Sequence, residues 1–95
     1  MYFTAYILYS PTKQKIYIGS SGSLIQRFYA HNKLEKKGWT IRYRPWVVIS
    51  GEFFEDKGAA KKREDQLKQA NWRKKIWEAI ERDYVTMRYI DLSRS

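Results

Sequence analysis

The segment 2–9 constrains the fold of this chain more than any other part of it. Its sequence, YFTAYILY, is rich in aromatic and β-branched residues, and it is largely apolar at both its odd and its even positions. Because successive side chains of a strand point to opposite faces of the sheet, a strand with this pattern is expected to be buried on both faces. The segment therefore predicts a central strand, covered on two sides.

Three strands and three helices are expected along the chain, in the order strand, strand, helix, strand, helix, helix. They cover approximately residues 2–9, 15–19, 24–34, 46–54, 57–69 and 71 onwards. Turn-forming residues at 10–14 join the first two strands into a hairpin, and Pro45 prevents a helix before the third strand. Residues 20–23 and Asp56 offer side chains that can cap the two helices following them. This order predicts an α/β (α+β) fold, in which a small three-stranded antiparallel sheet is flanked by helices.

Composition indicates a single basic domain. We place it at residues 1–83, with residues 84–95 as a tail or edge strand packed on it. Nineteen Lys and Arg against ten Asp and Glu give a net charge of +9, so a polyanion such as nucleic acid is the expected partner. The chain has no cysteine, and no apolar run approaches the roughly 20 residues of a membrane span. We therefore expect a cytoplasmic protein without a disulfide, a Cys-based zinc site or a membrane contact.

The sequence lacks the motifs of several common active sites. It contains no Gly-rich loop followed by Lys-Ser or Lys-Thr, no Gly-x-Ser-x-Gly and no histidine cluster. A Ser-His-Asp triad through Ser20 or Ser21 and His31 has no evident carboxylate to complete it. These observations argue against a P-loop nucleotide-binding protein, a serine hydrolase and a zinc enzyme.

The carboxylate of Glu64 is the one most constrained by its position. On a helix over 57–69 it falls at the edge of the apolar face, whereas Asp65 falls on the solvated face. A charge held beside a core is costly unless it is paired or bound to a cation. Glu64 is therefore expected either to pair with an arginine such as Arg27 or Arg63, or to bind a metal ion.

Two tyrosines and one histidine form a second candidate group. Tyr6 and Tyr17 lie on neighbouring strands, where they either pack in the core or place a phenol near a cation that lowers its pKa and lets it activate water. His31, the only histidine, follows Arg27 by four residues, so both lie together at the margin of the apolar face of their helix. Gly19 either permits a close backbone approach or serves a turn.

Basic residues interleaved with aromatic ones are candidates for contacts with nucleic acid. Such surfaces hold phosphates with their cations, to which we give more weight than to the rings. The predicted nucleic-acid-binding residues are Arg42, Arg44, Lys61, Lys68, Arg73, Lys74 and Lys75.

The order of these residues resembles the GIY-YIG nuclease family, and in particular its small standalone members. The matching positions are Tyr6 for the first motif, Tyr17-Ile18-Gly19 for the second, Leu24, Arg27, His31 and Asn32 for one helix, and Ala60, Glu64, Leu67 and Lys68 for another. Thr4 and Ala5 depart from the first motif. Ser20 stands where some family nucleases have a lysine, and Asn71 is the candidate for the family's late asparagine.

The resemblance implies metal-assisted hydrolysis of a phosphodiester. Glu64 would hold Mg²⁺ or Mn²⁺, and Arg27 would brace the phosphate. Either Tyr6 or Tyr17 would activate the water, with Tyr17 favoured because its motif is intact. His31 would assist by hydrogen bonding or as a proton relay.

The expected function is that of an endonuclease on DNA, with weak sequence specificity or recognition of DNA structure. Branched or damaged DNA, and a role in DNA repair or recombination, fit this expectation. RNA stays an alternative substrate, and a partner protein could supply targeting. The main alternative is a catalytically inactive nuclease-like fold that binds nucleic acid. A third is a protein-interaction module that meets an acidic partner.

Overall fold

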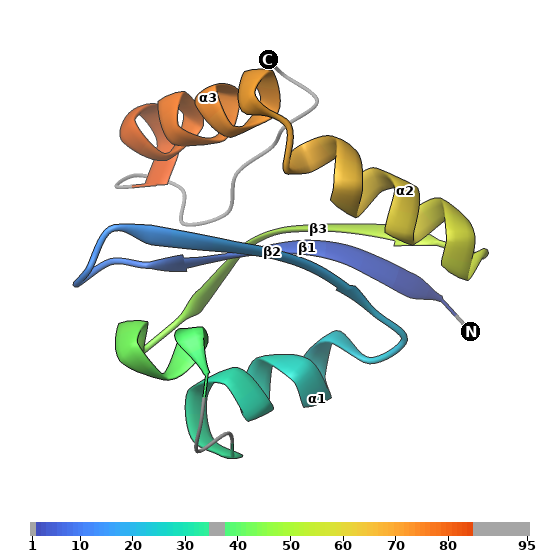
Figure 1. Ribbon diagram of the computed structural model, residues 1–95, viewed down its shortest axis with the longest axis horizontal. Coiled ribbons are helices and arrows are strands. Elements are labelled where there is room, and N and C mark those ends of the chain that lie inside the picture. The colour runs from blue at the N-terminus through green and yellow to red at the C-terminus, as the bar shows by residue number, and fades with distance from the viewer. Residues whose placement is uncertain (1, 35–37, 85–95) are drawn as a thin grey trace.

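A three-stranded antiparallel sheet forms the centre of the computed structural model, which describes residues 2–34 and 38–84 (Figure 1). The strand order is β2-β1-β3, so that β1 (Phe3–Ser10) lies between β2 (Lys15–Ser21) and β3 (Val47–Phe54). Helices cover both faces of this sheet. The predicted fold class, a small antiparallel sheet flanked by helices, is confirmed.

The helices are divided between the two faces of the sheet (Figure 1). One face carries α1, its continuation η1 and the short 3-10 helix η2, and the other carries α2 and α3, followed by η3. Their bounds are Leu24–Tyr29 for α1, Ala30–Leu34 for η1, Trp39–Tyr43 for η2, Lys57–Leu67 for α2, Ala70–Ala79 for α3 and Ile80–Tyr84 for η3.

β1 contributes to a separate core on each side. Seven of its eight residues are buried, as its sequence predicts for a central strand. Its odd positions, among them Ile7 and Tyr9, pack with the residues of α2 and α3. Its even positions Tyr6 and Leu8 pack with Trp46 and with residues of α1. The period of two in this strand therefore separates the two cores.

The third strand is fastened to the helical layer by Asn32. The Asn32 side chain accepts a hydrogen bond from the Trp46 backbone N–H at 2.6 Å and donates one to the Trp46 carbonyl at 3.2 Å. The buried Trp46 indole donates to the Thr40 carbonyl at 2.9 Å. These bonds join η1, η2 and the residue before β3, and they hold Trp46 in the core that it forms with Tyr6 and Leu8.

Element boundaries differ from the expected ones at a few places. β2 continues to Ser21, so only Ser23 of the expected capping residues caps α1, accepting from the Gln26 N–H. The expected single helix over 24–34 is wound as an α-helix and then as a π-helix. Tyr84 ends a helical turn, and the rest of the predicted tail or edge strand lies outside the described residues. No helix in the described ranges is long and apolar enough to cross a membrane.

Candidate active site

Tyr6 and Tyr17 lie side by side on the sheet face covered by α1. Their ring centroids are 6.3 Å apart, and the ring planes are inclined by 30°. In the pairing of β1 with β2, the residue opposite Tyr6 is Gly19. A Cβ atom at Gly19 would lie 2.7 Å from the Tyr6 hydroxyl and 3.0 Å from Cε1 of Tyr17. Gly19 therefore permits a close approach within a strand rather than serving a turn.

His31 lies against both tyrosines. Its Nε2 is 3.5 Å from the Tyr6 hydroxyl, and its ring centroid is 4.6 Å from that of Tyr17. The helical wheel places His31 at a solvent-facing margin beside Arg27, but the structure buries His31 and leaves Arg27 exposed. The wheel assumes regular α-helical winding, whereas residues 30–34 are wound as a π-helix, with bonds from i to i+5.

The Tyr6 phenol holds its proton strongly. Burial raises its pKa to about 12, the neighbouring Tyr17 acts in the same direction, and the Arg27 guanidinium opposes them by hydrogen bonding and by charge. A cation does lie beside Tyr6 and acts to lower its pKa, but the loss of hydration outweighs the effect of Arg27, so the net shift is upward and the alternative of a phenol packed in the core applies to Tyr6. Tyr6 acts as a hydrogen-bonding phenol at neutral pH.

Glu64 extends from α2 towards the end of β2. The Ser20 hydroxyl donates to its Oε1 at 2.6 Å, and Lys68 and Lys61 donate to its Oε2 at 2.6 and 3.3 Å. Glu64 is buried, as the wheel predicts, and it is paired. Its cationic partners are Lys61 of α2 and Lys68, which caps the end of α2, whereas the guanidinium of Arg63 pairs with Glu52 at 3.1 Å.

The Glu64 carboxyl is ionised in this environment. Burial by itself would raise its pKa, but the hydrogen bonds from Lys68, Ser20 and Lys61 outweigh burial and lower the pKa below its usual value. An ionised carboxylate beside a hydroxyl suits a hard divalent cation, which completes its shell with water and phosphate oxygens. Within the described residues no group of three or more His, Asp or Glu comes together, so the fit is that of a site with one protein carboxylate.

The two groups of residues approach each other at the end of β2. Consecutive residues point to opposite faces, so Gly19 faces the tyrosines while Ser20 faces Glu64. The Glu64 charge is among the causes that raise the Tyr6 pKa. A cavity of about 150 Å³ adjoins Ser20, with Lys57 and Ala60 of α2 among its lining residues. The end of β2 thus carries a carboxylate on one face and a guanidinium, two phenols and an imidazole on the other.

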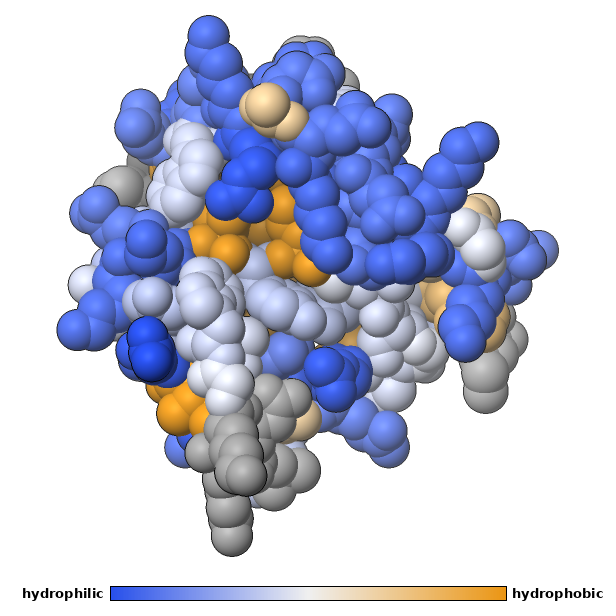
Figure 2. Space-filling model, in the orientation of Figure 1, coloured by the Kyte–Doolittle hydropathy of each residue, from blue (hydrophilic) through white to orange (hydrophobic). Residues whose placement is uncertain are grey.

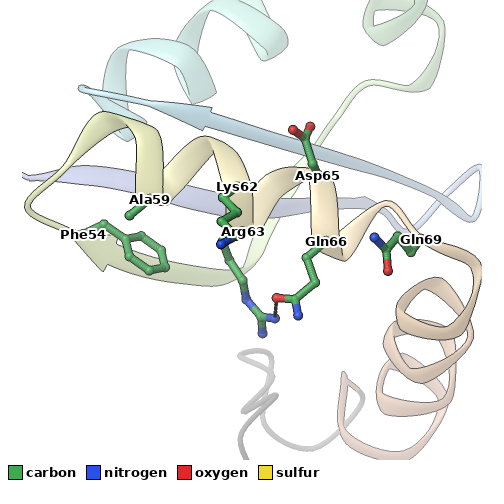
Figure 3. Close-up of a pocket in the computed structure, with 7 residues that line it drawn as sticks. All are labelled: Phe54, Ala59, Lys62, Arg63, Asp65, Gln66 and Gln69. Carbon is green, nitrogen blue, oxygen red and sulfur yellow. Dashed lines mark hydrogen bonds between the residues drawn. The ribbon is translucent and has the colours of Figure 1, made fainter.

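A larger cavity lies elsewhere and contains none of the predicted catalytic residues. It measures about 530 Å³, and Figure 3 shows it between α2 and the end of β3, where Arg63 donates to Gln66. Because β3 and β2 are opposite edges of the sheet, this cavity is separate from the site at Ser20. The residues that line it are Phe54, Ala59, Lys62, Arg63, Asp65, Gln66 and Gln69.

The predicted nucleic-acid-binding residues fall into two groups. Arg42 of η2, together with Arg73 and Lys74 of α3, is exposed, and Figure 2 shows that the surface over α2 and α3 is mainly hydrophilic. Lys75 is also exposed, but its ammonium lies 4.7 Å from the centroid of the Trp72 ring.

The other three predicted cations have partners within the protein. Lys61 and Lys68 bind Glu64. Arg44 is half-buried and donates to the backbone carbonyls of Ala30 and His31 at the end of the first helical segment. Its contacts therefore hold the helical layer together.

Sequence reasoning missed the contact of Ser20 with Glu64. The signal was available in the spacing of Ile16 and Ile18, which face the core beneath α2. Continuing this alternation by two residues places Ser20 on the same face as α2. Asn32 was found as part of a motif, but its bonds to Trp46 depend on a loop whose path the sequence does not show.

A model of a known protein family matches most of this chain. The family model of the GIY-YIG catalytic domain matches residues 2–77, a range that contains all three strands, α1 and α2. It also contains all five predicted catalytic residues. No curated protein matches the chain.

Proposed function

The chain belongs to the GIY-YIG family, and from this membership we propose that it is a metal-dependent endonuclease that hydrolyses phosphodiester bonds in DNA. The observation that carries the proposal is the ionised Glu64, held by Ser20 at the end of β2 one residue beyond Gly19, which packs against Tyr6 and Tyr17. Family membership supports a nuclease-type function, and the metal and the substrate are parts of the proposal.

Arg27 and Glu64 would act on the phosphate. The Arg27 guanidinium is exposed beside the Tyr6 phenol, where it can donate to phosphate oxygens. Glu64 would hold Mg²⁺ or Mn²⁺, and the cation would stabilise the negative charge that develops on the leaving oxygen. Both of its carboxylate oxygens accept hydrogen bonds in the protein alone, so Lys61, the more exposed of the two lysines, would have to give way.

The tyrosines would differ in their roles. Tyr6 keeps its proton because its pKa is raised, so we assign it hydrogen bonding and the positioning of its neighbours. Tyr17 is only half-buried, and we assign its hydroxyl the role of positioning the attacking water. As the water attacks phosphorus and the bond to the leaving oxygen breaks, the proton of the water would be taken up by His31, whose ring packs against that of Tyr17. Proton transfer of this kind is general base catalysis by a positioned pair.

Recognition of the substrate would rest mainly on charge. A net charge of +9 and the exposed cations Arg42, Arg73 and Lys74 favour contacts with phosphates, which carry no sequence information. We therefore propose weak sequence specificity or recognition of branched or damaged DNA, with RNA as the alternative. A cytoplasmic role in DNA repair or recombination, with targeting by a partner protein, would suit such an enzyme.

One observation favours a second candidate, an inactive nuclease-like fold that only binds nucleic acid. Two ammonium groups already neutralise Glu64, so a cation must compete with them for the carboxylate. In this alternative the positive surface and the fold remain, and the metal does not bind.

Cleavage of supercoiled plasmid and of branched DNA with Mg²⁺ or Mn²⁺ tests the proposal, with Glu64→Gln beside the wild type. We expect Glu64→Gln to abolish cleavage but to preserve the fold and most of the DNA affinity. Asp65→Asn is the matched control, because it removes an exposed carboxylate from the same helix. Equal loss in both variants would contradict a specific role of Glu64. Salt-sensitive DNA binding without cleavage by the wild type would favour the inactive alternative.

A further inference from the structure

Two aromatic side chains at one end of the sheet are exposed together. The exposed fraction is 57% for Tyr2 and 68% for Phe53. Their ring centroids are 6.5 Å apart, and the planes meet at 75°, which is an edge-to-face contact. We call Tyr2 and Phe53 the aromatic pair. Pairing of this kind keeps two large rings at defined positions on the surface.

The aromatic pair lies on the same face of the sheet as the candidate catalytic tyrosines. Phe53 of β3 is paired with Thr4 of β1, and Gly51 is paired with Tyr6. Since residues two apart on a strand share a face, Phe53 and Thr4 lie on the face that carries Tyr6, about 7 Å further along the strands. That distance corresponds to about two nucleotide steps of ~3.4 Å along one strand of a duplex.

A cation lies on this face beside the candidate site. The Arg27 guanidinium is hydrogen-bonded to the Tyr6 phenol, whereas Lys13 and Lys15 lie at the turn, at the other end of the hairpin. Glu52, the neighbour of Phe53, points to the opposite face of the sheet, where it pairs with Arg63. An exposed aromatic ring on the same face as Arg27 and the proposed phosphodiester site offers a surface on which a base can stack.

We propose that the aromatic pair stacks an unpaired base next to the phosphate that is cleaved. The inference rests on the proposed function and adds a substrate class to it. Inside a duplex, both faces of a base are covered by its neighbours, so only a base in a single-stranded segment, at an end or at a branch can stack on a protein ring. The protein therefore prefers nucleic acid with an unpaired nucleotide near the cleavage point over continuous duplex.

Fluorescence anisotropy in EDTA tests this preference without any cleavage. Labelled probes are single-stranded oligothymidine, a blunt duplex and the same duplex with a single-stranded overhang. Variants are Phe53→Ala, the conservative Phe53→Trp, and Tyr29→Ala, which removes another exposed aromatic side chain, on α1. We expect Phe53→Ala to weaken binding of the first and third probes roughly ten-fold and to leave the blunt duplex almost unchanged. Phe53→Trp and Tyr29→Ala are expected to bind all three as the wild type does.

The outcomes separate this inference from the nuclease proposal. Unchanged binding of single-stranded DNA by a folded Phe53→Ala variant overturns the stacking site. A second result would also overturn it: the wild type sediments as a dimer, Phe53→Ala sediments as a monomer, and neither prefers unpaired DNA. The aromatic pair would then hold a second copy of the chain. Binding of unpaired DNA that depends on Phe53, in a wild type that does not cleave with any metal, supports the stacking site and refutes only the nuclease.

Discussion

Replacing Gly19 by alanine tests whether the site depends on the close approach of Tyr6 to β2. The new Cβ would meet the Tyr6 hydroxyl at 2.7 Å and its Cζ at 2.9 Å, whereas ordinary contacts begin at 3.4 Å. The phenol would therefore have to move by about 0.7 Å. Tyr6 is 1% exposed and is packed with Leu8 and Trp46, so no free space receives the moving ring. The substitution thus overpacks a closed core.

The expected cost follows from this geometry. Overpacking of a core costs about 1–3 kcal/mol, and an added methyl group returns up to about 1 kcal/mol by restricting the unfolded chain. A net loss of about 1–2 kcal/mol corresponds to a fall in Tm of roughly 4–16 °C for a domain of this size. Because the hydroxyl also contacts His31, a displacement of this extent is expected to slow cleavage by about ten-fold or more.

Thermal unfolding by circular dichroism and plasmid cleavage measure the two effects. Gly22→Ala is the matched control, since its Cβ would meet Phe3 at an ordinary 3.5 Å. We expect this control to keep both the Tm and the cleavage rate. If Gly19→Ala also melts and cleaves like the wild type, Tyr6 can be displaced freely, and the argument from close packing is wrong.

Two further predictions concern stability. Asn32→Ala leaves the N–H and carbonyl of buried Trp46 without their Asn32 partner and should lower the free energy of unfolding by about 2–4 kcal/mol, as measured by chemical denaturation. Asn32→Asp keeps the acceptor for the Trp46 N–H and should lower it by about half as much. Glu64 has a lowered pKa in the folded protein, so its ionised form contributes stability above its unfolded pKa, near 4.5, and that contribution is lost as the pH falls through the folded value. The difference in Tm between the wild type and Glu64→Gln should therefore narrow below about pH 4.5, and a constant difference down to about pH 2 would contradict the assigned ionisation.

The fold was predictable because its central strand carries an unambiguous pattern. Residues 2–9 are apolar on both faces, and the structure buries both faces. The position of Glu64 at the edge of the apolar face of its helix was predictable for the same kind of reason, since a helical period fixes it. Its partners were not, because the wheel places Lys61 and Lys68 on the solvated side. Lysine side chains are long enough to reach around the helix and bring the ammonium to the carboxylate.

Other parts of the site depend on contacts that a local pattern does not contain. The burial of His31 results from a π-helical turn and from the tyrosine rings packed against it. The contact of Ser20 with Glu64 requires β2 to continue past Gly19, and a sequence pattern does not fix the residue at which a strand ends. The pKa of Tyr6 follows from how completely the fold excludes water from the phenol.

The hairpin imposes a rule of parity on this protein. On β2, Tyr17 and Gly19 face Tyr6, whereas Ser20 points to the opposite face of the sheet. Their contacts therefore depend on the register in which β2 pairs with β1. A slip of the β1–β2 pairing by one residue would turn Tyr17 away from Tyr6 and Ser20 away from Glu64 at the same time. A slip of two residues would keep every side chain on its face, but it would place Tyr17 or Ser21 instead of Gly19 opposite Tyr6. Changes of length in the turn at residues 11–14 are therefore compatible with this site only where they leave the β1–β2 register unchanged.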